Sequence, residues 1–129
     1  MAASDKTLKQ LYFDSIIQED IEKVKSCINL GVNINATDEE DEKTPALIYA
    51  MENYEIVELL LSQPNIDVNV KDEYGNTGFM MACWKGYPDI VRRLSYVPGI
   101  ELNCQDEEGN TPAICSVLDG QEECVKVLR

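Results

Sequence analysis

The stretch Asp72-Glu73-Tyr74-Gly75-Asn76-Thr77 returns 34 residues later as Asp106-Glu107-Glu108-Gly109-Asn110-Thr111, and all but one of its positions are identical. The same shift aligns glycine and apolar positions further along the chain: Gly86 with Gly120, Val91 with Val125, and Leu94 with Leu128. Matches that persist at one fixed offset indicate an internal repeat. The chain is therefore expected to be a tandem array of similar units.

Earlier copies of the unit precede these two. Asn35, Asn69 and Asn103 are spaced 34 residues apart, and an aspartate follows each of them three residues later. A more degenerate copy, which retains only the second half of the unit, occupies residues 21–35. The sequence thus predicts a single domain of residues 1–129 with four repeats, at residues 5–37, 38–71, 72–105 and 106–129.

Each unit begins with the signals of a short helix. Thr111 before Pro112, like Thr44 before Pro45, predicts a helix that the threonine caps and whose first position the proline occupies, where its missing N–H costs nothing. A glycine nine residues after Thr77, and another nine residues after Thr111, predicts the end of this helix.

A second helix and an extended return complete the unit. Apolar residues at i, i+1 and i+4, such as Ile90, Val91 and Leu94, predict the buried face of the second helix. Prolines 64 and 98 prevent that helix from continuing. The alternation of apolar and polar residues at positions 66–70 and 100–103 favours short strands, and the following Asp-Glu-x-Gly-Asn segment favours a turn.

These features resemble the ankyrin repeat, in which Thr-Pro-Leu-His-x-Ala is followed by a glycine, a Val-x-x-Leu-Leu helix and a hairpin that contains asparagine. The helix starts Thr44–Leu47, Thr77–Met80 and Thr111–Ile114 carry the resemblance, which spans nearly the whole chain. It implies an all-α repeat solenoid, an elongated stack of helix–turn–helix units with β-hairpin loops.

The sequence also departs from the ankyrin pattern. The family's histidine is replaced by apolar residues, namely Phe13, Leu47, Met80 and Ile114. The second repeat has one extra residue between Asn35 and Thr44, lacks a hairpin glycine, and has one residue fewer between Thr44 and Ile56. Its first helix is therefore expected to be shortened or displaced. The polar first repeat is expected to be a native N-cap, and the last repeat to be truncated inside its second helix.

The charge balance excludes several kinds of function. The 129 residues include 24 Asp and Glu against 11 Lys and Arg, no histidine, and a formal net charge of −13. So acidic a chain is unsuited to nucleic acid or to anionic membranes. Without histidine there is no Ser-His-Asp triad and no His-ligated zinc site. We expect no catalytic residue, no metal site and no cofactor.

The cysteines indicate a reducing compartment. Five cysteines are scattered without a Cys-x-x-Cys pair: Cys27, Cys83, Cys104, Cys115 and Cys124. The N-terminal residues lack the apolar region of a secretory signal, and no apolar run reaches the length of a membrane-spanning helix. We expect an intracellular protein, cytoplasmic or nuclear, with core cysteines except for an exposed Cys104.

The ankyrin resemblance implies that the hairpin tips and the exposed side of the first helices form a concave binding face. The tip positions are Glu39, Glu40, Asp41, Lys43, Glu73, Tyr74, Asn76, Glu107, Glu108 and Asn110. The helix positions are Met51, Glu52, Trp84, Lys85, Leu118 and Asp119. An acidic edge around the aromatic pair Tyr74 and Trp84 predicts a basic protein or peptide partner, bound by a monomer. The alternative is that Trp84 fills a gap between repeats and that the acidic tips only keep the chain soluble.

Other functions stay open at this level. Asn35, Asn69 and Asn103 precede turns, where asparagine bonds to nearby amides; the family resemblance also implies possible hydroxylation of these residues. Besides an adaptor, the chain fits an architectural segment of a longer ankyrin array or a small stand-alone inhibitor of another protein. An enzyme is disfavoured.

Overall fold

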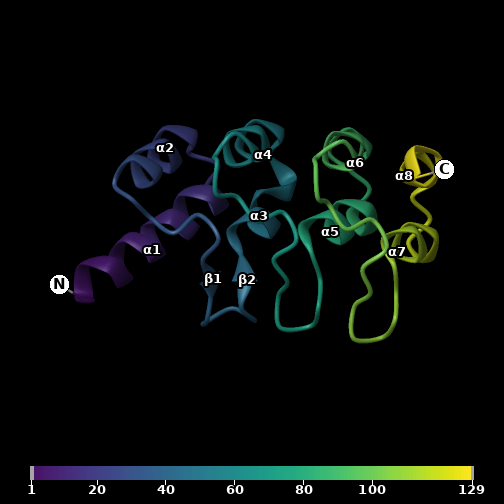
Figure 1. The fold of residues 1–129 in the computed structure, drawn as a ribbon, viewed down its shortest axis with the longest axis horizontal. Helices are drawn as coiled ribbons and strands as arrows, with labels where there is room; N and C mark the ends of the chain where they lie inside the picture. The colour runs from purple at the N-terminus through teal and green to yellow at the C-terminus, as the bar shows by residue number, and fades with distance from the viewer. Residues whose placement is uncertain (1, 129) are drawn as a thin grey trace. The chain divides into compact units, whose positions relative to one another are not determined.

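A computed structural model describes the backbone of residues 2–128 and the side chains of residues 8–128, so Met1 and Arg129 lie outside the described part. The chain divides into two compact units, Met1–Asp67 and Val68–Arg129. Each unit is built from pairs of helices joined by turns and long loops (Figure 1). The all-α repeat fold expected from the sequence is confirmed, whereas the single domain and the repeat boundaries stay predictions.

The first unit contains two helix pairs and a small hairpin. Its elements are α1 (Ala2–Ile17), α2 (Ile21–Asn29), β1 (Thr37–Asp38), β2 (Thr44–Pro45), α3 (Ala46–Tyr49), the 3-10 helix η1 (Ala50–Glu52) and α4 (Tyr54–Leu61). The rings of Phe13 on α1 and Tyr49 on α3 lie 5.6 Å apart. Tyr12 is fully buried and donates its hydroxyl to the carbonyl of Ile34, 3.0 Å away, so α1 anchors the loop that precedes β1.

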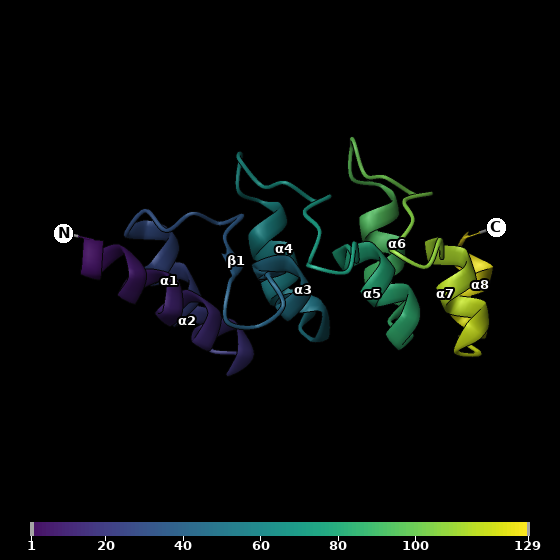
Figure 2. The ribbon, with the colours of Figure 1, turned by 90° about the horizontal axis from the view of Figure 1, so that it is seen from below.

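The second unit contains the two most regular repeats. Its helices are α5 (Gly78–Lys85), α6 (Pro88–Ser95), α7 (Pro112–Leu118) and α8 (Glu122–Leu128). Figure 2 shows α5 beside α7, and in Figure 1 α6 and α8 form the other layer. The buried Ser116 hydroxyl donates to the carbonyl of Cys83 at 3.2 Å. This bond ties α7 to α5 at the centre of the unit.

Of the two predicted threonine caps, at Thr44 and Thr111, the one at Thr111 is confirmed, and Thr77 caps α5 in the same way. The Thr77 hydroxyl accepts from the Met80 N–H at 3.2 Å, and Thr111 does the same for Ile114 at 3.3 Å. The Thr44 cap is wrong, because Thr44 lies in β2 and its hydroxyl donates to the carbonyl of Asp41 at 2.7 Å. The extra residue in the preceding loop turns this threonine into part of a hairpin, and α3 starts only at Ala46.

The shortened first helix of the second repeat is confirmed, since α3 has four residues before η1 begins. The hairpin of this repeat lacks a glycine, so other residues adopt the left-handed backbone that the turn requires. Glu42 and Lys43 adopt positive φ angles of 58° and 56°, where the corresponding turns use Gly75 and Gly109. Left-handed backbone costs an L-residue roughly 1 kcal/mol relative to glycine.

Lys43→Gly is therefore expected to stabilise the chain. Lys43→Ala removes the same charge but keeps the left-handed strain, so it is the matched control. We expect the glycine variant to exceed the alanine variant by about 1 kcal/mol in free energy of unfolding, measured by urea titration. Equal midpoints for the two variants would show that the hairpin carries no strain at this position.

The expected strands at 66–70 and 100–103 are wrong. Within residues 2–128 the only strand pair is β1 with β2, antiparallel, with Thr37 opposite Pro45. Asparagine side chains take the place of a strand ladder. The Asn69 amide donates to the carbonyl of Gly99 at 2.9 Å and accepts from the N–H of Glu101 at 2.9 Å. These loops therefore need no neighbouring strand to satisfy their backbone.

Candidate protein-binding surface

The loop tips of the second unit are shaped by two aspartates. The Asp72 carboxylate accepts from the N–H groups of Tyr74 and Asn76, both at 2.9 Å. Asp106 accepts in the same way from Glu108 and Asn110, again at 2.9 Å. Burial acts to raise the pKa of Asp106, but these hydrogen bonds outweigh it and lower the pKa. Each aspartate thus fixes a turn that presents the residues between its partners outward.

The two tips are joined to each other. The N–H of Glu107 donates to the carbonyl of Tyr74 at 3.1 Å, and the backbone of Asp106 passes so close to Gly75 that a methyl group there would touch it at 3.4 Å. Tyr74 remains 43% exposed, and Glu73, Glu107 and Glu108 are exposed. The structure therefore brings one aromatic side chain and three carboxylates onto neighbouring turns.

The helix positions of this unit form a second group. Trp84 and Lys85 end α5, and Leu118 ends α7, with Asp119 as its C-cap. The Gln121 side-chain amide donates to the carbonyl of Trp84 at 3.1 Å and to the carboxylate of Asp119 at 2.8 Å. Trp84 is 44% exposed and Leu118 71% exposed. One glutamine thus holds these two helix ends together beneath an exposed apolar pair.

In the first unit the acidic tip is the loop between β1 and β2. Glu39, Glu40 and Asp41 are exposed there, as is Glu52 at the end of η1. The Tyr49 hydroxyl contacts the carboxylates of Asp38 and Asp41. Burial and these two carboxylates raise the pKa of Tyr49, so the phenol stays protonated and fastens the loop to α3. The carboxylates of Glu39, Glu40 and Asp41 on this loop therefore stay exposed to solvent.

Two residues expected on the binding face, Met51 and Asn76, are corrected because the structure buries them, and a third, Asn110, is half-buried. Met51 is buried because it lies in η1, whose tighter 3-10 turn directs it inward. Asn76 is buried because its amide donates to the Asp72 carboxylate at 3.2 Å and closes the turn. Asn110 makes the same bond to Asp106 at 3.3 Å and is half-buried. Both tip asparagines thus help to close their turns, and contact of Asn110 with a partner stays a prediction.

The cysteines behave as core residues. All five are buried and reduced, which confirms four expectations and corrects the exposed position expected for Cys104. The Cys104 thiol lies 3.6 Å from the Thr77 hydroxyl and 3.6 Å from the carbonyl of Glu101, because its loop folds back onto the start of α5. Burial raises the pKa of Cys83 to about 12 and also raises the pKa values of Cys27, Cys115 and Cys124.

These shifts predict alkaline unfolding. A thiol whose folded pKa lies above its unfolded value near 9 stabilises the fold fully below pH 9. That contribution is lost as the pH rises toward 12, because the unfolded chain then ionises more readily than the folded one. We expect the thermal midpoint to be flat from pH 7 to about 8.5 and to fall steadily above pH 9. Cys83→Ala should show a smaller fall than the parent chain, and parallel curves would contradict the prediction.

Among the described residues, no group of three or more Cys, Asp or Glu side chains is arranged to hold a metal ion. Helices in that part of the chain are all too short or too polar to cross a membrane.

The asparagines proposed for hydroxylation make structural hydrogen bonds where their partners are described. Asn35 donates to the carbonyl of Asn65 and accepts from the N–H of Asp67, both at 2.8 Å. Hydroxylation of Asn35, Asn69 and Asn103 stays a prediction.

Some exposed apolar residues escape the sequence pattern. Ile114 is 42% exposed and Val117 is 63% exposed, although they occupy the repeat positions of Met80 and Cys83, which are fully buried. Tyr96, after α6, is 79% exposed. Sequence periodicity alone does not identify these positions, because a repeat pattern does not say whether another element covers a given repeat.

Helix pairs with hydrogen-bonded loop tips define a helical repeat protein. Two family models match the chain: "Ankyrin repeat" over residues 41–73 and "Ankyrin repeats (many copies)" over residues 59–114. Together they cover more than half of the chain. The chain belongs to the ankyrin-repeat family, whose repeats generally mediate protein–protein interaction.

Two relatives are similar over part of the chain. An ankyrin repeat protein of Escherichia coli strain K12, YahD, is 32% identical over 80 residues, which are 62% of this chain and 39% of that protein. Rabankyrin-5 of Mus musculus is 34% identical over 61 residues, 47% of this chain and 5% of that protein. The chain thus corresponds to well under half the length of either relative.

Proposed function

We propose that this chain is a non-enzymatic adaptor that binds a basic protein or peptide through the second unit. The observation that carries the proposal is the hydrogen bond from Glu107 to Tyr74, which fixes a half-exposed aromatic ring among exposed carboxylates. A few anchor residues, among which tyrosine and tryptophan are enriched, supply most of the binding energy at protein interfaces, and surrounding charges select the partner and speed its encounter.

The helix ends extend this surface. Trp84 and Leu118 offer exposed apolar area, and Lys85 and Asp119 flank them. The acids of the first unit, Glu39, Glu40, Asp41 and Glu52, are proposed as further contacts in their own right, because they are exposed on a turn that Tyr49 holds in place. The reduced thiols support an intracellular location, cytoplasmic or nuclear.

The experiment is capture from cell extract with immobilised chain, quantified by mass spectrometry. We expect a set of basic proteins whose recovery falls at least about tenfold with Tyr74→Ala/Trp84→Ala, since an anchor contributes roughly 1–2 kcal/mol or more. Tyr96→Ala is the matched control, because Tyr96 is more exposed but follows a second helix. Equal recovery with all three baits would contradict the proposal.

Charge reversal separates the electrostatic part. Glu107→Lys/Glu108→Lys should slow association with a captured basic protein and flatten its salt dependence between 50 and 500 mM, as expected for steered encounter, on the order of tenfold. Glu122→Lys/Glu123→Lys changes the net charge equally on α8 and should have a much smaller effect. If both variants act equally, only net charge matters and the tips are not selective.

A further inference from the structure

The thiols of the second unit lie close to one another. Four of the chain's five cysteines belong to this unit: Cys83, Cys104, Cys115 and Cys124. Cys104 lies in the loop before α7, and Cys115 lies within α7. The side chains of Cys104 and Cys115 pack with Met80 in one buried cluster. The loop and the helix therefore bring two thiols into the same small part of the core.

The two thiols of this cluster influence each other. Burial raises the pKa of Cys115, and the charges of the Asp106 carboxylate and the Cys104 thiol raise it further. Such an effect falls off with distance, so it marks Cys104 as a neighbour of Cys115. Side-chain proximity is the first requirement of an intramolecular disulfide.

Cys104 is the most accessible of the five cysteines. It is 9% exposed, against 4% for Cys115 and 0% or 1% for the other three. Its loop has no regular secondary structure, and the N–H groups of residues 102–105 have no hydrogen-bond partner among the described residues. Few bonds hold this segment, so small local movements can expose its thiol or shift it toward a neighbour.

A hydroxyl lies next to the Cys104 sulfur. The sulfur is 3.6 Å from the Thr77 hydroxyl and 3.6 Å from the carbonyl of Glu101. The Thr77 oxygen already accepts from the N–H of Met80, so its own proton is available to the sulfur. A sulfur that attacks an oxidant carries negative charge, and a hydroxyl beside it can donate to that charge.

The remaining thiols are less suited to reaction. Cys83 is fully buried in α5, and burial raises its pKa to about 12. Cys124 in α8 is 1% exposed, and burial raises its pKa too. Cys27 belongs to the first unit. Cys83 is near Cys115 because α5 packs beside α7 (Figure 2), but a bond between them would have to draw two packed helices together.

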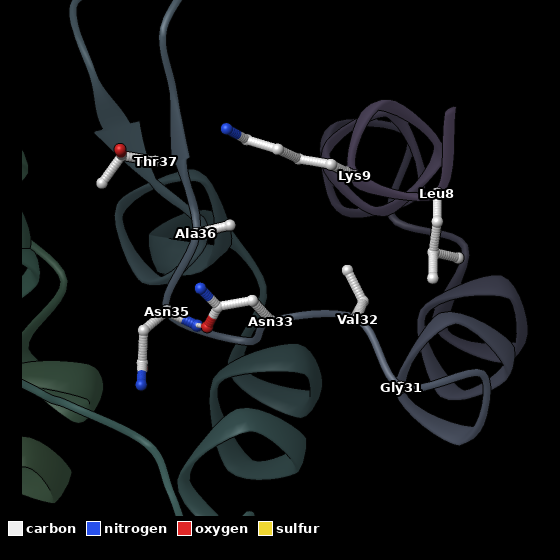
Figure 3. A pocket seen from close by; sticks show the side chains of 8 residues that line it. All are labelled: Leu8, Lys9, Gly31, Val32, Asn33, Asn35, Ala36 and Thr37. Carbon is white, nitrogen blue, oxygen red and sulfur yellow. Dashed lines mark hydrogen bonds between the residues drawn. The ribbon is translucent and has the colours of Figure 1, made fainter. Parts of the chain in front are cut away.

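The cavity of the first unit offers no comparable chemistry. It has a volume of about 510 Å³ and lies between α1 and the segment that leads into β1 (Figure 3). Lys9 extends from α1, and Asn33 and Thr37 border the cavity on the other side (Figure 3). Its described lining residues include neither a cysteine nor a carboxylate. Paired nucleophiles are thus a feature of the thiol cluster in the second unit.

We propose that Cys104 and Cys115 are a redox pair, in which a peroxide oxidises Cys104 and Cys115 then closes a disulfide. Hydrogen peroxide suits this site because it is small enough to reach a thiol that is only 9% exposed. Under reducing conditions both thiols stay reduced, and the bond forms only when peroxide is present. Neither step uses the surface proposed for partner binding, so the pair can be tested apart from that function.

Both steps balance with water as the only by-product. The Cys104 sulfur attacks one oxygen of hydrogen peroxide, the S–O bond forms, the O–O bond breaks, and the leaving hydroxide takes the thiol proton as water. The Cys115 sulfur then attacks the sulfenic sulfur, the S–S bond forms, the S–O bond breaks, and the second hydroxide leaves with the Cys115 proton as water. The two thiols lose two electrons in total, and the peroxide accepts both.

The disulfide closes residues 104–115 into a ring. This ring contains the turn that Asp106 fixes and the Thr111 cap of α7. A short closed loop has less conformational freedom than an open one, so amide hydrogen exchange within residues 105–110 should slow by at least about threefold after oxidation.

The experiment treats the parent chain with excess hydrogen peroxide near neutral pH, blocks the remaining thiols with N-ethylmaleimide and measures the mass. The intact chain should lose the mass of two hydrogen atoms and keep three of its five thiols for alkylation. Cleavage after glutamate places Cys104 in residues 102–107 and Cys115 in residues 109–122, whereas trypsin leaves both in residues 94–126. A disulfide should join the two glutamate-cleaved peptides at least about tenfold more often than any other pair.

Serine variants separate the two roles. Cys115→Ser should accumulate the sulfenic acid of Cys104, which dimedone labels, whereas Cys104→Ser should leave Cys115 unlabelled. Cys124→Ser is the matched control, because it also removes a buried thiol of the second unit and should form the Cys104–Cys115 bond like the parent. Circular dichroism melting checks that each variant is folded.

The peptide map of the parent chain decides the proposal even where a variant does not fold. A Cys104–Cys115 bond that dithiothreitol reverses supports it. A dominant Cys83–Cys115 bond, bonds only between chains, sulfinic acid at Cys104 without a bond, or five intact thiols would each overturn it. Dimedone labelling of Cys115 in Cys104→Ser, as strong as that of Cys104 in Cys115→Ser, would overturn the assigned order of attack.

Discussion

Cys83→Asp is expected to unfold the second unit. Cys83 is fully buried, with 0% exposure. Helix α7 packs over it, and the Ser116 hydroxyl of α7 donates to its carbonyl. An aspartate there would be a buried charge without a partner, and such a change costs about 3–5 kcal/mol. That is a large part of the stability of a small domain.

Val117→Asp is the matched control. Val117 occupies the same repeat position one period later but is 63% exposed, so the same side chain should change the free energy of unfolding by less than about 0.5 kcal/mol. Urea unfolding followed by tryptophan fluorescence is suitable, because the chain's one tryptophan, Trp84, lies in the second unit. Similar losses for both variants would show that Cys83 is not covered as described.

Asn69→Ala is expected to destabilise the second unit by about 2 kcal/mol. It removes two hydrogen bonds of 2.9 Å, each of which contributes roughly 1 kcal/mol, and it frees the loop at Gly99 and Glu101. Asn35→Ala removes the equivalent bonds to residues 65 and 67 in the first unit. Fluorescence at Trp84 should report the Asn69 change strongly, and circular dichroism should report both.

Asn103→Ala is the control for these asparagine hydrogen bonds. Among the described side chains and backbone of residues 8–128 its amide has no hydrogen-bond partner, so this variant should lose less than about 0.5 kcal/mol. The three asparagines share one sequence pattern, and only their partners differ. If all three alanine variants lost the same stability, the asparagines would act through local turn propensity, and their hydrogen bonds to the neighbouring loop would be irrelevant.

Much of the fold follows from local chemistry along the chain. Thr77 and Thr111 cap helices because a hydroxyl in extended backbone reaches the N–H three residues on. Gly86 ends α5 with φ of 80°, a conformation that glycine adopts without strain. These effects act within a few residues, and they recur in each repeat because the same residues return every 34 positions. The repeat fold and the order of its helices were predictable for that reason.

The candidate site was predictable only in part. Tyr74, Trp84, Leu118 and the tip acids are exposed as expected, but Met51 and Asn76 are buried. Counting positions from the threonine assumes that every repeat has the same helix, and in the second repeat a deletion replaces the end of α3 with a 3-10 turn. Asn76 was misplaced because the pattern identified a turn without showing which side chain closes it.

The sequence by itself determined the period, the helix pairs and the acidic character of the tips, since these depend on neighbours in the chain and on composition. Only the tertiary structure decided which members of each equivalent set are covered. Met80 and Ile114, or Asn69 and Asn103, have the same sequence context, yet one of each pair is packed or bonded and the other is open to solvent. The physical reason is that burial and hydrogen bonding depend on the next element in space, and a repeat pattern is the same whether that element is present or absent.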